Sequence, residues 1–325
     1  MEYREAVQCG IRVPSIGLGT WAFGSDAWWG HQDDRRSWEV LDEALSRAVN
    51  LVDTAPVYGR GHSEEVIGEF IAHHRCRDRV ILATKTGLKW REKDPRIFHD
   101  LSPRRMREEF DQSRRRLRTD YFDIYQVHWP DSDTPIEATA EQMRQFYEKG
   151  QIRAVGVSNY SAVQMETFMT ECPLHFLQPP YNMFRREIES ELLPFCREKG
   201  IAVLAYAPLH SGILTGKFFF DRVKIPNDIL RRKHRDLREP RAGVNKETLS
   251  RLRSIARDQE KSLGQLVLQW TAAQEGITSV LTGARSRVQM RENALSQAGT
   301  LSPAVLAQIR EILEERDRKL AEHDA

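Results

Sequence analysis

The sequence predicts a single (β/α)₈ barrel that occupies the whole chain, residues 1–325, with an N-terminal β-hairpin and a C-terminal helix. Eight short apolar stretches recur along the chain, and amphipathic segments of helical period alternate with them. No stretch has the composition of a linker, and barrels of this kind commonly exceed about 250 residues as one domain.

The predicted strands are rich in Val, Ile, Leu and Ala and show no polar alternation. Parallel strands that are buried on both faces have this composition. They are Ile16–Leu18, Leu51–Asp53, Val80–Lys85, Phe122–His128, Ile152–Ser158, Phe176–Gln178, Ile201–Ala207 and Thr278–Leu281.

The predicted helices carry apolar residues at spacings of three and four. Ser102 and Pro103 supply a cap and a first-position proline to one of them, and Ser63 precedes the acidic first turn of another. They are Arg35–Val49, Ser63–His73, Pro103–Leu117, Pro135–Glu148, Ala162–Glu171, Ile188–Lys199, Lys246–Gln259 and Leu263–Gln274.

Three segments lie outside this repeat. Val7–Val13 has the pattern of a tight hairpin that turns at Cys9-Gly10 and would plug one end of the barrel. Leu209–Val244 is too long for an ordinary connection, and such loops are usually functional or mobile. Ser302–Ala321 is an amphipathic helix.

A doubly wound dehydrogenase sheet is the competing architecture. It requires a glycine fingerprint between its first strand and a following helix. Gly17-Leu18-Gly19-Thr20 begins like that fingerprint, but the third glycine is missing and no helix begins there. The closed barrel is therefore the prediction.

Composition excludes several classes of protein. A net charge of +2 offers no field for nucleic acid or an anionic membrane. No apolar run approaches the ~20 residues that span a bilayer, and the N-terminus lacks the apolar core of a signal peptide. Cys9, Cys76, Cys172 and Cys196 form no C-x-x-C pair, so we expect free thiols. We expect a soluble cytoplasmic protein, monomeric or weakly homo-oligomeric, without nucleic-acid or membrane partners.

Polar residues gather where the predicted strands end, which is where chemistry occurs in this fold. Tyr58 follows Asp53 in the loop Tyr58-Gly59-Arg60-Gly61. Singly, a tyrosine in a loop or a histidine at a strand end is more often structural; the combination points to chemistry. The other strand-end residues are Lys85, His128, Ser158, Asn159, Gln178 and Tyr206.

Four of these residues together can act on a carbonyl oxygen. A buried Lys85 beside Asp53 would be a costly pair if nothing used it. A neighbouring lysine favours the phenolate of Tyr58, so we expect its pKa to fall from about 10 toward neutrality, where it can exchange a proton. His128 can hold the substrate oxygen by a hydrogen bond as negative charge develops.

The stretches that carry these residues resemble the aldo-keto reductase family from about Val7 to Asn293. Asp53-Thr54-Ala55-Pro56-Val57-Tyr58-Gly59 resembles the signature around its catalytic Asp and Tyr. Ala83-Thr84-Lys85 and Gln126-Val127-His128-Trp129 resemble its lysine and histidine strands. Four further stretches resemble the cofactor-binding segments of the family: Gly156–Asn159, Gln178–Asn182, Tyr206–Leu209 and Gly283–Asn293.

The resemblance implies reduction of a small-molecule aldehyde or ketone to an alcohol, with NADPH as cofactor and NADH as the less favoured one. Hydride would come from the nicotinamide and the proton from Tyr58. Asp53 would hold Lys85, Lys85 would tune Tyr58, and His128 would polarise the carbonyl. The implied cofactor-binding residues are Gly19, Thr20, Trp21, Ser158, Asn159, Gln178, Tyr206, Ala207, Pro208, Leu209, Ser211, Gly212, Lys217, Gly283, Ala284, Arg285, Gln289, Glu292 and Asn293.

Two segments depart from the family's common pattern. Gly283 and Ala284 stand where many members bind the 2′-phosphate with a lysine and a Ser or Thr, so Arg285 and Arg287 are expected to receive it at a helix start. The long segment with Lys217 resembles the bacterial and potassium-channel β-subunit-like branch, in which such a loop folds over the pyrophosphate.

Tryptophans in loops at the functional end predict an apolar pocket for flat or aromatic aldehydes, with Trp21, Trp29 and Trp129 in its wall. Two other functions stay open. One is an NADP(H)-binding, redox-sensing regulatory subunit with slow or no turnover. The other is a metal-dependent hydrolase that uses Asp53, His128 and His210, but the strand ends supply one clear histidine and we expect no metal.

Overall fold

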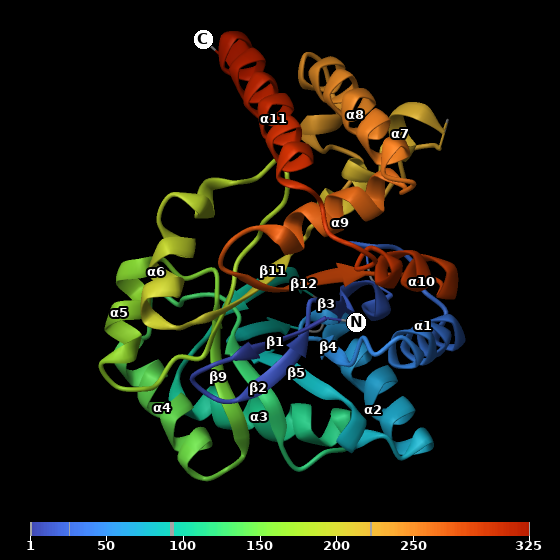
Figure 1. The fold of residues 1–325 in the computed structure, drawn as a ribbon. Helices are drawn as coiled ribbons and strands as arrows, with labels where there is room; N and C mark the ends of the chain where they lie inside the picture. Colours follow the sequence, from blue (N-terminus) through green and yellow to red (C-terminus); the bar gives the residue numbers. More distant parts are fainter. Residues whose placement is uncertain (1, 26, 92–93, 222, 325) are drawn as a thin grey trace.

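Eight parallel strands close into a barrel, as predicted, and helices surround it (Figure 1). This computed structural model describes residues 2–25, 27–91, 94–221 and 223–324. The order of strands around the barrel follows the order along the chain, and the last strand pairs with the first. The strands are β3 (Ile16–Gly19), β4 (Leu51–Asp53), β5 (Ile81–Thr86), β8 (Phe122–Val127), β9 (Ile152–Ser158), β10 (Phe176–Gln178), β11 (Ala202–Tyr206) and β12 (Ile277–Gly283).

The register of these strands brings their carboxyl ends to one rim. Gly19 pairs with Asp53, Lys85 with Gln126, and Gln178 with Ser158. Gly283 also pairs with Gly19, so residues from opposite ends of the chain are neighbours at the same edge of the barrel.

The helices cover the barrel as the apolar spacing predicts, with shifts at some ends. α8 begins at Arg241 because Pro240 can precede a helix, and residues 187–189 form a 3₁₀ turn before α6. The helices are α1 (Asp34–Ser46), α2 (His62–His74), α3 (Pro103–Leu117), α4 (Ile136–Glu148), α5 (Ala162–Met169), α6 (Leu192–Lys199), α7 (Lys217–Phe220), α8 (Arg241–Asp258), α9 (Leu263–Ala273), α10 (Arg287–Leu295) and α11 (Pro303–Asp324).

The N-terminal hairpin consists of β1 (Tyr3–Ala6) and β2 (Ile11–Pro14), so it begins earlier in the sequence and is longer than the predicted Val7–Val13. It turns at Cys9-Gly10, where both amides donate to the carbonyl of Ala6. Apolar side chains of the hairpin fill one end of the barrel interior. This cluster includes Ala6, Ile11, Val13, Leu51, Ala83, Ile124, Ala154, Phe176, Ala202, Leu204 and Leu281.

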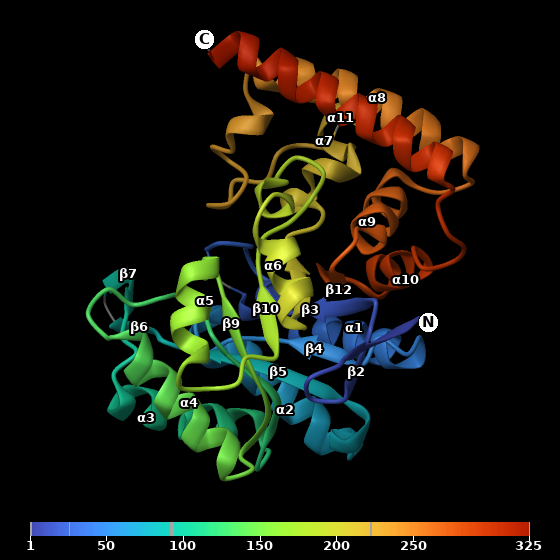
Figure 2. The same cartoon turned by 60° about the vertical axis from the view of Figure 1, so that its left-hand side comes forward.

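The stretch after β5 and the long loop contain structure that the sequence did not predict. A second hairpin, β6 (Leu88–Arg91) and β7 (Asp94–His99), follows β5. The segment 209–244 holds the 3₁₀ turns η5 (His210–Thr215) and η6 (Arg235–Leu237), the short helix α7, and the start of α8. α11 packs along α8 beyond the barrel (Figure 2).

No helix in the described part of the chain is long and apolar enough to cross a membrane.

Gly68 allows α2 to touch the end of α3. A Cβ atom at this position would lie 2.0 Å from the carbonyl oxygen of Arg116 and 2.8 Å from the Cα of Leu117. Both are backbone atoms, so no side chain can move aside.

We predict that Gly68→Ala lowers the free energy of unfolding by about 3 kcal/mol, because overpacking against backbone outweighs the helix propensity that alanine adds. Gly264→Ala, where the new Cβ would make only ordinary contacts at 3.7–3.8 Å, is the matched control and should be neutral or slightly stabilising. Denaturant titration of both variants measures this difference; equal stability would contradict the backbone contact.

Candidate active site

A cleft of about 1280 Å³ opens where the barrel strands end. Pockets for drug-sized ligands usually measure about 300–1,000 Å³, so this one suits a longer ligand. All the predicted cofactor residues line it, as do Asp53, Tyr58, His128 and the predicted tryptophans. Lys85 lies behind the floor of the cleft and is fully buried.

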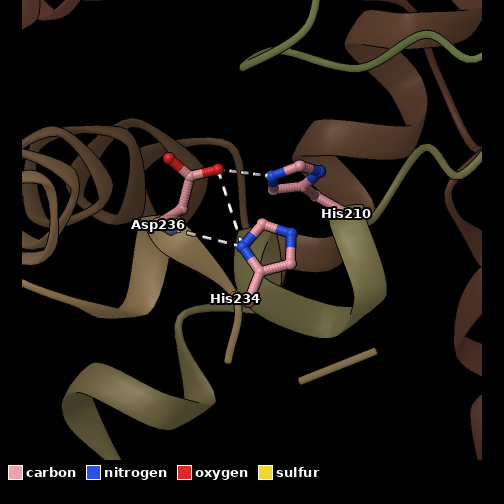
Figure 3. A group of neighbouring side chains, drawn as sticks. All are labelled: His210, His234 and Asp236. Carbon is pink, nitrogen blue, oxygen red and sulfur yellow. Dashed lines mark hydrogen bonds and ion pairs between the residues drawn. The ribbon is translucent and has the colours of Figure 1, made fainter. Parts of the chain in front are cut away.

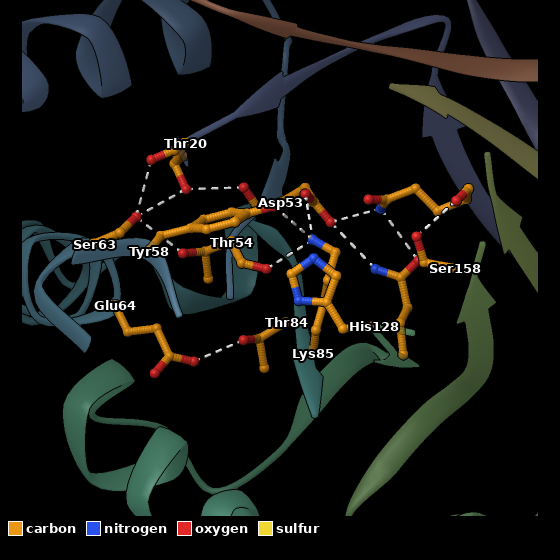
Figure 4. Close-up of polar contacts among 12 residues, drawn as sticks. Thr20, Asp53, Thr54, Tyr58, Ser63, Glu64, Thr84, Lys85, His128 and Ser158 are labelled. Carbon is orange, nitrogen blue, oxygen red and sulfur yellow. Dashed lines mark hydrogen bonds and ion pairs between the residues drawn. The ribbon is translucent and has the colours of Figure 1, made fainter. Parts of the chain in front are cut away.

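Asp53, at the floor of the cleft, forms an ion pair with Lys85 behind it (Figure 4). The Lys85 ammonium donates to Asp53 Oδ2 at 2.7 Å, to the carbonyl of Thr54 at 2.9 Å and to the Tyr58 hydroxyl at 3.5 Å. The other carboxylate oxygen of Asp53 accepts from Gln178 Nε2 at 2.8 Å and Gln126 Nε2 at 3.2 Å. The buried charges are thus paired and hydrogen-bonded, which burial requires of them.

The pKa of Tyr58 is raised well above its ordinary value, so the predicted fall of this pKa was wrong. Burial of the phenol is the largest cause, and the charge of Asp53 adds to it. Lys85 does not overcome these effects, because its ammonium is closer to Asp53 than to the phenol. Burial also lowers the pKa of Lys85, against the opposing charge of Asp53. Tyr58 is therefore a protonated phenol at neutral pH.

His128 faces Tyr58 across the cleft, with ring centroids 5.9 Å apart and the rings nearly perpendicular. Burial, and then the positive charge of Lys85, hold its pKa well below the ordinary value. A neutral imidazole can donate one hydrogen bond and accept another. Asn159 fixes this segment by donating to the His128 carbonyl at 3.0 Å.

Two glycines explain the placement of Tyr58. Gly24, in the turn η1 (Trp21–Gly24), packs against Gly59, in the turn η2 (Tyr58–Gly61), so closely that a Cβ on Gly59 would meet the Gly24 backbone. Gly59 also has φ 61°, which favours glycine. This contact lets Trp21 stack on Tyr58 at 5.7 Å.

Four of the predicted cofactor-binding residues form one hydrogen-bonded row. Ser158 Oγ donates to the Gln178 carbonyl at 2.7 Å, and Asn159 Nδ2 donates to Ser158 Oγ at 3.0 Å. The Tyr206 hydroxyl donates to Asn159 Oδ1 at 3.0 Å. These contacts hold the Tyr206 ring beside the floor of the cleft.

The two arginines expected to share a phosphate point to different places. Arg287 lies 3.7 Å from Glu43 on α1 and does not line the cleft. Arg285 lines the cleft, but its guanidinium donates to Gln32 Oε1 and the Trp29 carbonyl, each at 3.0 Å, and to the His31 carbonyl. The expectation of a joint site is therefore wrong for Arg287.

A group of cations faces the cleft near Lys217. Burial lowers the pKa of Lys217, and the charges of Arg231 and Arg285 lower it further. Like charges gathered in this way favour an anion between them. Arg231, which the sequence reasoning did not select, pairs with Asp228 and covers the Trp29 ring at 5.1 Å.

The outer part of the cleft is aromatic. Trp21 lies 5.9 Å from Trp28 and 6.0 Å from Trp29, measured between ring centroids. Trp129 is 40 % exposed at the mouth. The unpredicted β6–β7 hairpin adds Leu88, Ile97 and His99 to this wall. The alternation Leu88-Lys89-Trp90-Arg91 is the sequence signal that could have revealed it.

The structure does not group Asp53 and His128 with His210, as a metal hydrolase would require. The group in the described part of the chain that has metal-like spacing is His210, His234 and Asp236. Arg241 already contacts its carboxylate at 2.9 Å, so we assign no metal there.

The chain belongs to the aldo/keto reductase family, since the profile of that family matches residues 15–314. The aldo-keto reductase YhdN of Bacillus subtilis (strain 168) is 42% identical over 97% of this chain and 94% of its own length. The NADH-specific methylglyoxal reductase of Escherichia coli (strain K12) is 34% identical over 95% of this chain and 97% of its own.

The predicted similarity to potassium-channel β subunits is also confirmed. A probable voltage-gated potassium channel subunit beta of Arabidopsis thaliana is 31% identical over 98% of both chains. Among solved structures, the glycerol dehydrogenase AKR11B4 from Gluconobacter oxydans superposes with a TM-score of 0.87 at 35% identity, covering 94% of this chain and 93% of that one. The chain is therefore similar to carbonyl and alcohol oxidoreductases along nearly its full length.

The raised pKa of Tyr58 predicts that this phenol does not ionise below about pH 10 in the ligand-free protein. Ultraviolet titration of wild type and Tyr58→Phe measures this, and the two curves should coincide up to that pH. A tyrosinate transition near neutrality that is present in wild type and lost in the variant would contradict the assignment.

Proposed function

We propose that this protein reduces aldehydes or ketones to alcohols with NADPH, and that Tyr58 supplies the proton. The observation that carries the proposal is the hydroxyl of Tyr58, 3.5 Å from the Lys85 ammonium and opposite a neutral His128. Membership of the aldo/keto reductase family supports the reaction class.

The residues of the cleft fit a nicotinamide dinucleotide. The Ser158, Asn159 and Gln178 row offers amide and hydroxyl groups near Tyr58, and the Tyr206 ring lies beside them. Lys217 and Arg231 offer positive charge further along the cleft. When bound, the cofactor supplies the hydride.

The protein's own part is to hold a carbonyl oxygen and to give it a proton. His128 can donate a hydrogen bond to that oxygen from its neutral ring. Tyr58, kept protonated by burial, can transfer its proton as charge develops. The phenolate that remains is then stabilised by Lys85, which Asp53 keeps in place.

The substrates that we propose are flat or aromatic aldehydes. Trp21, Trp29 and Trp129 line the cleft, and the Trp21 ring stacks on Tyr58. Aromatic side chains bind rings by burial and stacking. The methylglyoxal reductase among the relatives acts on a small carbonyl, so methylglyoxal belongs in the test panel.

The preference for NADPH over NADH rests on Arg285, which lines the cleft beside Gly283 and Ala284 and would favour the extra phosphate. The Escherichia coli relative is NADH-specific, so both cofactors must be compared. The second candidate function is an NADP(H)-binding regulatory subunit with slow or no turnover. The channel subunit beta among the relatives favours it.

We predict that Tyr58→Phe lowers kcat about 10²–10⁴-fold, the usual contribution of a general acid, while the Kd for cofactor changes little because the ring remains. Oxidation of NADPH and of NADH by wild type and variant, with aromatic aldehydes and methylglyoxal, measures this, together with cofactor titration by tryptophan fluorescence. Equal rates in the two proteins would refute the role of Tyr58. Tight cofactor binding without turnover by wild type would favour the regulatory subunit.

A further inference from the structure

The turn after β11, residues 207–212, has an unusually strained backbone at the side of the cleft. Ala207, His210 and Ser211 have φ of 55°, 48° and 57°, and Gly212 has φ 86°. Residues with side chains rarely adopt this left-handed conformation, and they persist in it only when surrounding contacts enforce it. All four line the cleft, so the same backbone that is strained forms part of the predicted cofactor surface.

Two side chains tie this turn to the rest of the molecule. Asn182 Nδ2 donates to the Ala207 carbonyl at 3.1 Å and lies 3.4 Å from His210 Nδ1. The opposite ring nitrogen of His210, Nε2, lies 2.8 Å from a carboxylate oxygen of Asp236 (Figure 3). Because Asn182 donates toward Nδ1, the Nε2 atom carries the proton and donates it to Asp236.

Asp236 is itself held from α8 and α11. Arg241 Nε donates to its second carboxylate oxygen at 2.9 Å, and a guanidinium nitrogen of Arg316 lies 3.8 Å away. Asn245 Nδ2 donates to the Asp236 carbonyl at 3.0 Å, and Asn245 Oδ1 accepts from Arg316 Nε at 2.8 Å. Asp236 and Arg316 are each 3 % exposed, so these contacts are shielded from water.

Both charge and packing stabilise the contacts of Asp236 and Arg316. Burial disfavours the Asp236 carboxylate, but hydrogen bonds from His210 and Arg241 outweigh it and hold its pKa well below the ordinary value. The Arg316 guanidinium also stacks on the Phe184 ring at 3.7 Å, beside the segment that contains Asn182. A continuous series of side-chain contacts therefore connects Arg316 on α11 to the turn 207–212.

We infer that Asp236 and Arg316 are positioning residues that hold the turn 207–212 in its cofactor-binding conformation, so that α11 acts on the cleft through His210. This inference rests on the proposed function, because the ligand of the turn is taken to be the nicotinamide dinucleotide. If only a fraction of the molecules has the turn in its binding conformation, the apparent Kd equals the intrinsic Kd divided by that fraction.

Arg316→Met tests the inference, because methionine fills the space without the guanidinium. Glu315→Gln is the matched control: Glu315 precedes Arg316 on α11 and binds Arg251 and Lys319 rather than Asp236. Hydrogen exchange of the ligand-free proteins reports the order of the turn. Titration with NADPH and NADH reports Kd, and kcat is measured at saturating cofactor.

In Arg316→Met we expect faster exchange of the amides of residues 207–216 and a Kd about tenfold higher, which corresponds to about 1.4 kcal/mol. The kcat at saturation should stay within about twofold, and Glu315→Gln should match wild type in all three. Unchanged exchange and Kd in a folded Arg316→Met would overturn the inference, as would equal changes in the control.

Arg241→Gln, which removes the other guanidinium from Asp236, replaces Arg316→Met if that variant does not fold, with the same expected results. Failure of the proposed function is separately visible. Wild type would then bind neither cofactor, while the exchange experiment would still decide whether Arg316 orders the turn.

Discussion

Lys85 is fully buried, and the site depends on how its positive charge is compensated. Asp53 lies 2.7 Å away and receives two further hydrogen bonds from glutamine side chains on β8 and β10. Removing one partner of such a pair typically costs about 3–5 kcal/mol, because the other is left charged and buried. The pair therefore links β4, β5, β8 and β10, and the Tyr58 hydroxyl lies next to it.

The barrel supplies the geometry that this pair requires. Parallel register places Gly19, Asp53 and Ala83 side by side, so the residues that follow them meet at one rim. The glycine contact between η1 and η2 then sets the Tyr58 ring against Trp21. The ring can approach the ammonium because no Cβ separates the two turns. Packing at the rim and the pKa of the phenol are thus consequences of the same arrangement.

Much of the fold and of the cleft was predictable from the sequence. Buried parallel strands are continuous apolar runs, so β5 and β8 stand out against amphipathic neighbours. The cleft residues follow these strands directly, and their common edge follows from the topology. The β6–β7 hairpin was missed because its strands are short, and the alternation in Leu88-Lys89-Trp90-Arg91 covers too few residues to stand out.

Two errors in the predicted site have the same physical origin. The direction of the Tyr58 pKa depends on burial and on two distances from Lys85, one to the phenol and one to Asp53, which a sequence does not contain. The direction of the Arg287 side chain depends on how α10 is rotated about its axis relative to α1. On α1, Glu43 pairs with Arg47 and Arg291, and these arginines lower its pKa to about 2. In both cases the sequence identified the residue, but the contacts of its side chain depend on an orientation that the sequence does not show.

In the proposed reaction, hydride passes directly from a bound nicotinamide to a carbonyl carbon beside Tyr58. The most direct measurement is a reduction with cofactor deuterated at both positions of the nicotinamide C4, followed by mass spectrometry and NMR of the alcohol. Deuterium bound to the carbinol carbon is the predicted result, with solvent hydrogen on the oxygen. An alcohol whose carbinol hydrogen comes from solvent, or the absence of any alcohol with either cofactor, would contradict it.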